Sequence, residues 1–362
     1  MTLDLILVGF GNVGRRLATL LREQAARLAQ DHELATRVVG IVTRHHGCAY
    51  AARGLDAVAL SDAPTVGPAA SSPIDFFDST LARSAATARD GRLVVVETTT
   101  LDIKNGEPAI SHVRQALSAG AHVVTANKGP AAFAYQSLAR AATAAGRRFL
   151  FEGAVMDGIP IFNLVRETLP SVEVVGFRGI VNTTTNYMLN AMELGQPVDD
   201  ALTEMQAMGV AEADASLDVD GWDAAAKTAA LANVLMGATL TPHRVERHGI
   251  RPELAARAIE ARAAGRRLKL VARAGYDRGR IAARVGPEEL RADDLLAGID
   301  GQQNALVLHT DLLGEIAIVQ RGSGLVQTAY AVVSDLVTVS RDRAAARATR
   351  PSRPPARQGR SR

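Results

Sequence analysis

An apolar run that ends in a glycine-rich turn stands near the start of the chain and constrains the fold more than any other feature. Residues 3–8 read Leu-Asp-Leu-Ile-Leu-Val, and Gly9-Phe10-Gly11-Asn12-Val13-Gly14 follows directly. Leucines at near-helical spacing come next, in "RRLATLLREQAARLA". A G-x-G-x-x-G turn between a buried strand and a helix suits a dinucleotide, because glycines let the backbone approach a pyrophosphate and the helix N-terminus donates N–H groups. We therefore predict that this turn binds a dinucleotide cofactor through Gly9, Gly11, Asn12, Val13 and Gly14.

Strand-like and helix-like segments alternate through about the first 150 residues. The apolar segments "TRVVGIVTR", "RLVVVETTT" and "AHVVTANKGP" are separated by helical patterns such as "AISHVRQALSAG". This alternation is typical of an α/β fold with a Rossmann-type, doubly wound parallel sheet. We therefore expect a nucleotide-binding domain over residues 1–150.

The rhythm of the sequence changes after about residue 150. The segments "RRLKLVARAGY", "RIAARVGPEEL" and "NALVLHTDLLGEIAIVQRG" follow one another with short turns, which favours a mostly antiparallel sheet. We expect a second α+β domain over residues 151–318 and a C-terminal helix over 319–340.

The last residues differ in composition from the rest of the chain. Residues 341–362 hold eight Arg and one Asp, a charge of +7, and subtracting this from the net charge of +3 leaves about −4 for residues 1–340. A segment rich in Pro, Arg and Ala buries little apolar surface, so we expect a disordered tail. An arm for nucleic acid is the functional alternative, and we favour an extension without function.

Several classes of protein and site are disfavoured by what the chain contains. No apolar run reaches membrane length, and the apolar start has no basic segment ahead of it, so we expect no membrane association. A single cysteine, Cys48, rules out an intramolecular disulfide framework and fits a cytoplasmic location. His45 and His46 lack a second cluster at metal-ligand spacing, which argues against zinc, and we interpret His309 as structural.

The end of the second predicted strand bears on the choice of cofactor. A carboxylate at this position would accept from the ribose 2′-hydroxyl of NAD, but "VVGIVTRHHG" offers none. It offers Arg44, whose guanidinium can bind a 2′-phosphate. We therefore predict that NADP(H) is preferred over NAD(H), although Arg44 as a merely solvated loop residue remains the alternative.

A charge-poor helix after residue 221 carries the strongest chemical signal. "DGWDAAAKTAALANVLMGATL" holds Asp223 and Lys227 one turn apart and no other charge within the helix. A surface ion pair is the plain interpretation, worth only about 0.3–0.5 kcal/mol. The acidic stretch just upstream, "GVAEADASLDVDGWD", instead suggests a site that binds a cation such as a substrate ammonium, or a metal.

Four segments in this order give the chain a resemblance to a known family. "VVTANKGP", "FEGAVMDGIPI", "IVNTTTNYML" and "AEADASLDVDGWDAAAK" resemble homoserine dehydrogenase, and the likeness covers roughly residues 3–340. The resemblance implies reversible NAD(P)-dependent interconversion of L-aspartate 4-semialdehyde and L-homoserine, in threonine, methionine and isoleucine biosynthesis. It implies a short form without kinase or ACT domains, and a homodimer paired through a second domain that also binds substrate.

The resemblance assigns roles to individual residues. It implies that Lys227 and Lys128 are catalytic and that Glu212, Asp223 and Asp218 bind substrate. It places Thr98, Thr99, Lys128, Gly209 and Gly324 at the cofactor. It also implies a monovalent cation, Na⁺ or K⁺, held by main-chain carbonyls of Glu152, Val155, Asp157 and Ile159; a turn that only shapes the site is the alternative.

Physical reasoning adds conditions to these roles. A general base must remove the hydroxyl proton as hydride leaves carbon. A lysine does so near neutrality only if its pKa is lowered, and we expect Lys128 and Lys227 to lower each other's pKa. Ala215 and the segment "RGSGL" around Gly324 depart from the family pattern, so the shapes of those two loops are open.

Two other functions compete with this interpretation. An aspartate-semialdehyde dehydrogenase needs a cysteine nucleophile, and Cys48 lies too early in the chain. A Rossmann-fold regulator or sensor without catalysis, with the arginine tail as an arm for nucleic acid, would not need Lys128, Lys227 and the acidic stretch.

Overall fold

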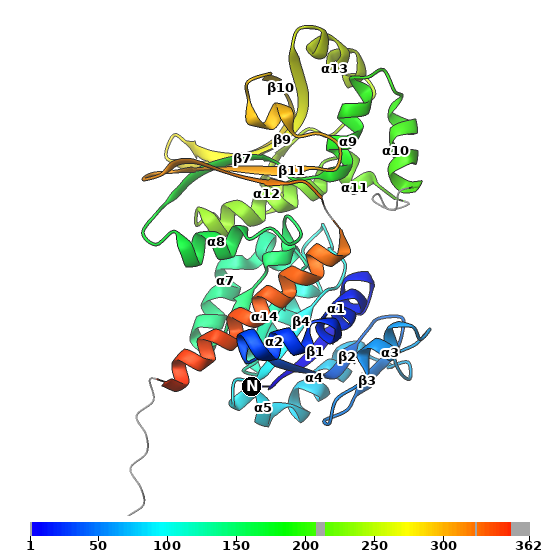
Figure 1. The fold of residues 1–362 in the computed structure, drawn as a ribbon, viewed down its shortest axis with the longest axis vertical. Helices are drawn as coiled ribbons and strands as arrows, with labels where there is room; N and C mark the ends of the chain where they lie inside the picture. Colours follow the sequence, from blue (N-terminus) through cyan, green and yellow to red (C-terminus); the bar gives the residue numbers. More distant parts are fainter. Residues whose placement is uncertain (1, 208–213, 323, 349–362) are drawn as a thin grey trace, which may run out of the picture.

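The computed structural model describes residues 2–207, 214–322 and 324–348, with side chains up to residue 343. Two six-stranded sheets organise the chain into two halves, one above the other in Figure 1. Glu212, Gly209 and the residues beyond 348 lie outside the described part.

The first sheet has the strand order β3-β2-β1-β4-β5-β6. Its strands β2, β1, β4, β5 and β6 run parallel, and only β3 is antiparallel to its neighbour β2. The predicted Rossmann-type sheet is therefore confirmed. The strands are β1 (Thr2–Val8), β2 (Ala35–Val42), β3 (Cys48–Tyr50), β4 (Leu93–Glu97), β5 (His122–Thr125) and β6 (Phe149–Leu150).

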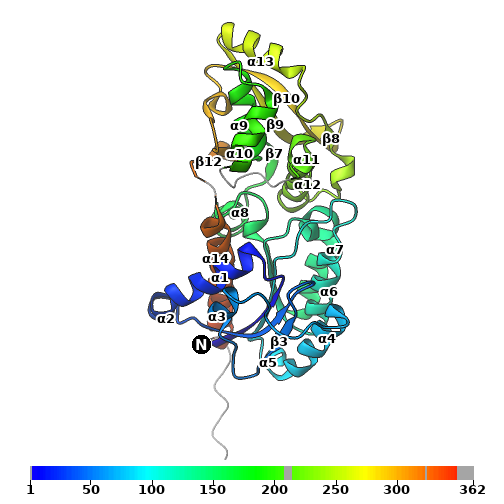
Figure 2. The same ribbon diagram turned by 90° about the vertical axis from the view of Figure 1, so that its right-hand side faces the viewer.

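Helices cover both faces of this sheet, as Figures 1 and 2 show together. Their apolar stripes pack on strands that are buried along their whole length, such as β4. The helices of this half are α1 (Asn12–Glu23), α2 (Ala25–His32), α3 (Ala57–Ser61), α4 (Pro73–Arg83), α5 (Ala85–Arg89), α6 (Ala109–Ser118) and α7 (Gly129–Ala145).

The second sheet has the order β12-β11-β7-β9-β10-β8 and is antiparallel except where β8 joins β10. This confirms a second, mixed domain after residue 150. Its strands are β7 (Val174–Ile180), β8 (Glu246–Arg247), β9 (Arg266–Asp277), β10 (Arg280–Arg291), β11 (Asn304–Thr310) and β12 (Gly314–Gln320). Its helices and 3₁₀ turns are η1 (Glu152–Ala154), α8 (Ile161–Thr168), α9 (Thr183–Met192), α10 (Val198–Ala207), α11 (Ser216–Val219), α12 (Trp222–Leu235), η2 (Pro242–Arg244), α13 (Leu254–Ala263) and η3 (Leu295–Gly298).

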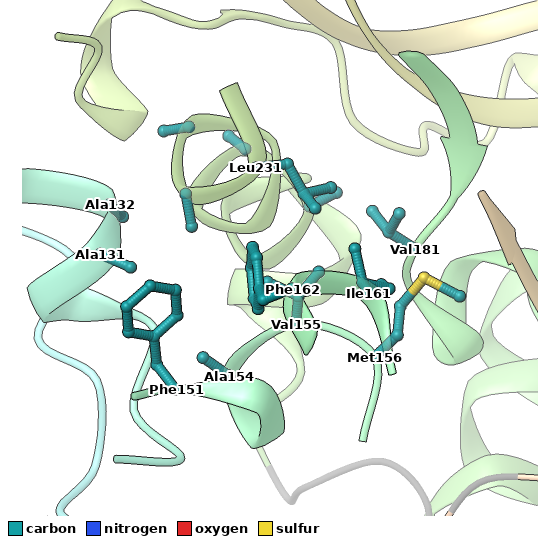
Figure 3. Packing of buried hydrophobic residues seen from close by; sticks show 14 of the residues in the cluster. Ala131, Ala132, Phe151, Ala154, Val155, Met156, Ile161, Phe162, Val181 and Leu231 are labelled. Atoms are coloured by element: carbon teal, nitrogen blue, oxygen red, sulfur yellow. The ribbon is translucent and has the colours of Figure 1, made fainter. Parts of the chain in front are cut away.

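The alanine-rich helix α12 lies between the two halves, beneath the second sheet and beside α7 (Figure 1). Its residues from Ala224 to Asn233 are buried, apart from Lys227. Small alanine side chains let the neighbouring elements approach closely, and Leu231 fills the space above Phe162 and Val155 (Figure 3). Burial on nearly all sides explains why this helix carries so few charges.

The C-terminal helix α14 (Leu325–Ala348) runs from the second half back along the first (Figures 1 and 2). Val332 and Leu336 join α1 and the strands of the first sheet in one apolar cluster. The predicted end of this helix at residue 340 is wrong, because the helix continues to Ala348. The sequence "RDRAAARA" is made mostly of strong helix formers, and Asp342 pairs with Arg148 at 2.6 Å.

Candidate active site

The glycine turn has the shape that a dinucleotide phosphate requires. Helix α1 begins at Asn12, and the capping residue Gly11 leaves its first turn without a side-chain cap. A Cβ on Gly9 would lie 2.7 Å from the main-chain carbon of Thr98, and one on Gly14 would lie 2.9 Å from the oxygen of Gly9. A Cβ on Gly11 would meet nothing within 4 Å. Gly9 and Gly14 are therefore required by packing, while Gly11 leaves open space beside uncapped N–H groups, which fits a pyrophosphate.

The ends of β4 and β5 meet this turn and are held by a buried carboxylate. The Thr98 hydroxyl donates to the oxygen of Gly9 at 2.9 Å. Glu97 is fully buried and accepts from the Thr99 N–H at 3.0 Å and from the Thr125 hydroxyl at 2.8 Å. Asn127 donates to the Thr99 carbonyl at 2.9 Å. The structure thus brings Thr98 and Thr99 to the predicted cofactor turn and fixes the loop that carries Lys128.

The turn after β2 is also next to the glycine turn, because the Gly9 N–H donates to the Val42 carbonyl at 2.9 Å. Arg44, His45 and His46 are exposed there, and residues 43–47 include no carboxylate. The turn is held by Thr43, which is buried. Arg44 therefore lies beside the predicted cofactor turn, with its side chain exposed and accessible to the 2′-phosphate of an NADP molecule bound there.

A cluster of two lysines and two carboxylates lies where the second half meets the first. Asp223 at the start of α12 lies 2.9 Å from Lys128 through Oδ1 and 3.0 Å from Lys227 through Oδ2. Lys227 also donates to the Val181 carbonyl at 2.8 Å. Asp218 of α11 joins through Asn182, whose amide contacts both carboxylates. Predicted residues nearly a hundred positions apart therefore form one site.

The charges in this cluster control one another's ionisation. Burial raises the pKa of Asp223, but Lys128, Lys227 and Asn182 outweigh it and hold this pKa well below its usual range. Burial and the nearby Asp223 charge raise the pKa of Asp218.

The expectation that the two lysines lower each other's pKa is wrong for Lys227. Burial lowers the pKa of Lys227, but the carboxylates of Asp223, Asp157 and Asp218 more than offset it and leave this pKa raised. The expected effect considered the two lysines alone, whereas in the structure the Asp223 carboxylate lies between them. These carboxylates therefore favour the protonated form of Lys227.

The loop that was predicted to hold a monovalent cation lies between α14 and the site. The Glu152 carboxylate is buried and accepts from the N–H groups of Phe162 and Asn163 at 2.9 and 2.7 Å. Asp157 has a φ of 48° and accepts from the Thr328 hydroxyl at 3.0 Å. The side chains of Glu152 and Asp157 are thus engaged by the protein, which leaves main-chain oxygens, the hard ligands that suit such a cation. Over the described residues, no group of three or more His, Cys, Asp or Glu side chains could hold a metal ion.

Other predicted residues stand apart from the cluster. Gly324 lies just ahead of α14, near the Asp157 loop, and its carbonyl accepts from the Thr328 N–H. His309 pairs with Glu315 across the β11–β12 hairpin at 3.2 Å, in line with a structural role. Burial raises the pKa of the Cys48 thiol, which makes it a poor nucleophile.

Asn182 and Val181 hold the cluster together from the segment between β7 and α9, and neither was predicted from the sequence as a site residue. A signal for Asn182 was present, because an asparagine followed by three threonines and an apolar helix is a typical N-cap. Its contacts to Asp218 and Asp223 depend on tertiary structure, so the spacing of these residues in the sequence does not reveal them.

A dinucleotide turn and a partly buried lysine–carboxylate cluster that meet at the carboxyl ends of a parallel sheet are typical of a dinucleotide-dependent dehydrogenase. Family models described as the NAD binding domain of homoserine dehydrogenase and as homoserine dehydrogenase match residues 9–152 and 160–337. The chain therefore belongs to the homoserine dehydrogenase family and is an oxidoreductase.

Individual relatives agree with this assignment. The chain is 36% identical over 338 residues to a protein named NAD(+)-dependent homoserine dehydrogenase from Pseudomonas canavaninivorans, covering 92% of this chain and 95% of that one. It is 35% identical over 354 residues to a homoserine dehydrogenase from Methanocaldococcus jannaschii, covering 93% and 98%. The crystal structure of a homoserine dehydrogenase from Thiobacillus denitrificans is similar with a TM-score of 0.79 and 32% identity, over 95% of this chain and 74% of that one.

Proposed function

We propose that the chain catalyses the reversible, NAD(P)-dependent interconversion of L-aspartate 4-semialdehyde and L-homoserine. The observation that carries this proposal is the Asp223 carboxylate shared by Lys128 and Lys227, beside strand ends that suit a nicotinamide cofactor. A regulator that only senses a nucleotide has no need to place two lysines around one partly buried carboxylate.

The cofactor, when bound, supplies or accepts the hydride. Among the described residues, Lys227 uses two of its three N–H donors on Asp223 and the Val181 carbonyl, which leaves one donor for a substrate oxygen. The raised pKa keeps Lys227 protonated, so that a proton is available for the aldehyde oxygen during reduction. Oxidation would need the small neutral fraction of Lys227, which grows as pH rises, to accept the hydroxyl proton. Asp218 is available to bind the substrate ammonium, a role that we also assign to Glu212 and Asp223. Lys128 contacts the Asp223 carboxylate from the nucleotide side.

We propose NADP(H) as the preferred cofactor. The support is the exposed Arg44 at the end of β2, in a turn that offers no carboxylate to a 2′-hydroxyl. The Pseudomonas relative is named for NAD(+), so the opposite preference is the alternative to be tested.

We further assign a Na⁺ or K⁺ ion to the main-chain carbonyls of Glu152, Val155, Asp157 and Ile159. We assign cofactor contacts to the glycine turn, Thr98, Thr99, Gly209 and Gly324. Residues 1–150 would bind the nucleotide and 151–318 the substrate and a second copy of the chain, while helix α14 (Leu325–Ala348) returns to the nucleotide domain.

The resemblance to the family also supports a proposal for the cellular setting. We propose a cytoplasmic homodimer that acts in threonine, methionine and isoleucine biosynthesis. Within the described residues, no helix is long and apolar enough to cross a membrane. We propose no nucleic-acid partner for the arginine-rich end of the chain.

The decisive test is an assay of the purified chain with aspartate 4-semialdehyde and NADPH or NADH, followed by cofactor absorbance. Turnover to homoserine is expected with at least one cofactor, and the reverse reaction is expected with homoserine. A folded protein that binds a nucleotide but turns over neither substrate would contradict the proposal in favour of a sensor.

A further inference from the structure

The segment between β7 and α9 holds an asparagine whose four hydrogen-bonding positions are all used. Asn182 is 5% exposed and caps α9 in an extended conformation. Its Oδ1 accepts from the Thr185 N–H at 2.8 Å and from the Thr185 hydroxyl at 2.9 Å. An amide NH₂ could not accept from a main-chain N–H, so this cap fixes which way the amide points.

The amide nitrogen of Asn182 therefore faces the lysine–carboxylate cluster. Its two hydrogens donate to Asp218 Oδ1 at 2.7 Å and to Asp223 Oδ2 at 2.9 Å. The two carboxylates come from different helices, α11 and α12, and their like charges repel. A neutral donor between them offsets this repulsion without adding a charge.

The neighbouring residue holds the catalytic lysine. The Val181 carbonyl accepts from Lys227 Nζ at 2.8 Å, and Asp223 Oδ2 lies 3.0 Å from the same atom. Asp223 Oδ2 thus accepts from Asn182 and pairs with Lys227, while Asp223 Oδ1 pairs with Lys128 at 2.9 Å. Two consecutive residues consequently fix the carboxylates and the lysine relative to each other.

We propose that Asn182 is a positioning residue for the reaction, bridging Asp218 and Asp223 so that Asp223 presents one oxygen to each lysine. This inference rests on the proposed function. Asn182 acts through the two carboxylates rather than on the substrate, and its cap on α9 is what orients it.

A purely structural cap is the competing role, and Asn182→Ser separates the two. Serine is also a good N-cap and can accept from the Thr185 N–H, but its single hydroxyl cannot donate to both carboxylates. We expect an unchanged melting temperature and a fall of about 10- to 100-fold in kcat/KM for homoserine, the range that a hydrogen bond to a charged group is worth. KM for the cofactor should not change.

The pH profile of kcat/KM supplies a second readout. Among the described residues, the charged groups that face the two carboxylates are Lys128 from the start of α7 and Lys227 from α12, with Asp157 near Lys227. The uncharged groups are Asn182 and the side chain of Thr184, which hydrogen-bonds Asp218. Removing the Asn182 donors removes a contact that favours the ionised carboxylates, so the acid limb should move to higher pH. Asn182→Asp, which keeps a capping oxygen but adds a negative charge, should move this limb further.

Asn190→Ser is the matched control. Asn190 lies on the same helix, and its amide donates to Asp300 at 2.6 Å, outside the cluster. This variant should keep wild-type kinetics and pH profile.

The outcomes separate this inference from the function on which it rests. An active wild type whose Asn182→Ser variant keeps the wild-type kcat/KM and acid limb overturns the positioning role alone. So does a loss of activity that Asn190→Ser reproduces, since that would reflect α9 stability. If Asn182→Ser does not fold, a folded Asn182→Asp with an unshifted acid limb overturns the role. A wild type inactive on both substrates overturns the proposed function as well.

Discussion

At the scale of single residues, Asp223 is the centre of the site. An Asp and a Lys one turn apart on an exposed helix would be a weak pair, worth about 0.3–0.5 kcal/mol. Here the pair is nearly buried, and Lys128 arrives from another element to share the carboxylate. The two lysines lower the pKa of Asp223, and Asp223 in turn raises the pKa of Lys227.

Replacing Lys227 by Ala should remove the proton donor that we propose, without unfolding the protein. We expect kcat to fall by at least ~10², in line with general acid–base contributions of about 10²–10⁴. Steady-state rates and a melting curve should be measured together, with the exposed Lys104→Ala as the control. Near-native turnover by a folded Lys227→Ala enzyme would contradict the catalytic role and show that the Asp223–Lys227 pair is only a structural ion pair.

Arg44 carries the prediction on cofactor choice. A charge-assisted contact to the 2′-phosphate is worth roughly 1.5–3 kcal/mol, so kcat/KM should favour NADPH over NADH by about one to two orders of magnitude. Arg44→Ala should weaken NADPH and leave NADH almost unchanged, whereas Arg53→Ala, at another exposed arginine, should change neither. Dissociation constants for both cofactors are needed, because a tightly held phosphate can slow turnover. Equal binding of NADH and NADPH by the wild type would refute the role of Arg44.

At the scale of elements, the two ends of the parallel sheet differ in chemistry. The carboxyl ends of β1, β4 and β5 carry the glycine turn, the threonine pair and Lys128, because only there do the loops and helix N-termini meet. At the opposite end, His122 begins β5 and is buried among arginines, with its Nδ1 accepting from the Arg148 N–H at 3.0 Å. Burial first, and then Arg147, Arg343 and Arg148, lower the pKa of His122 to about 4.

The lowered pKa of His122 predicts a loss of stability in acid. The unfolded chain binds a proton near pH 6.5, while the folded protein resists it until about pH 4, so the free energy of unfolding should fall as pH decreases through this window. A difference of this size corresponds to roughly 3 kcal/mol. Urea denaturation between pH 4.5 and 7.5 should show a shallower decline for His122→Gln than for the wild type. The exposed His32→Gln serves as control and should follow the wild type.

At the scale of the whole molecule, one apolar cluster joins both halves. It includes Val95 of the first sheet, Leu231 of α12 and Leu270 of the second sheet. Helix α14 adds a second connection, because it starts beside the Asp157 loop and packs along α1. The site between the halves therefore depends on a core that neither half completes alone.

Leu231→Ala tests this shared core. Leu231 is fully buried in the contact between the halves, so its truncation should lower the free energy of unfolding by about 2–5 kcal/mol. Circular dichroism and the fluorescence of Trp222 at the start of α12 should report one common transition in the variant and in the wild type. Two separate transitions would show that the halves fold independently.

The sequence by itself determined the classes of element and much of the chemistry. The apolar run, three glycines and a helical pattern specify a strand–turn–helix unit, because few other local structures satisfy all three. The spacing of Asp223 and Lys227 placed both on one helix face, and the absence of a carboxylate near Arg44 can be read directly. These features are local, so their physical meaning does not require distant residues.

Only the tertiary structure decided how the distant residues meet. It brought Lys128 to Asp223, inserted that carboxylate between the lysines and so reversed the expected direction of the Lys227 pKa shift. It also placed Asn182 between two carboxylates and extended α14 past residue 340. Ionisation depends on burial and on charges within a few ångströms, and those are set by packing between elements far apart in the chain.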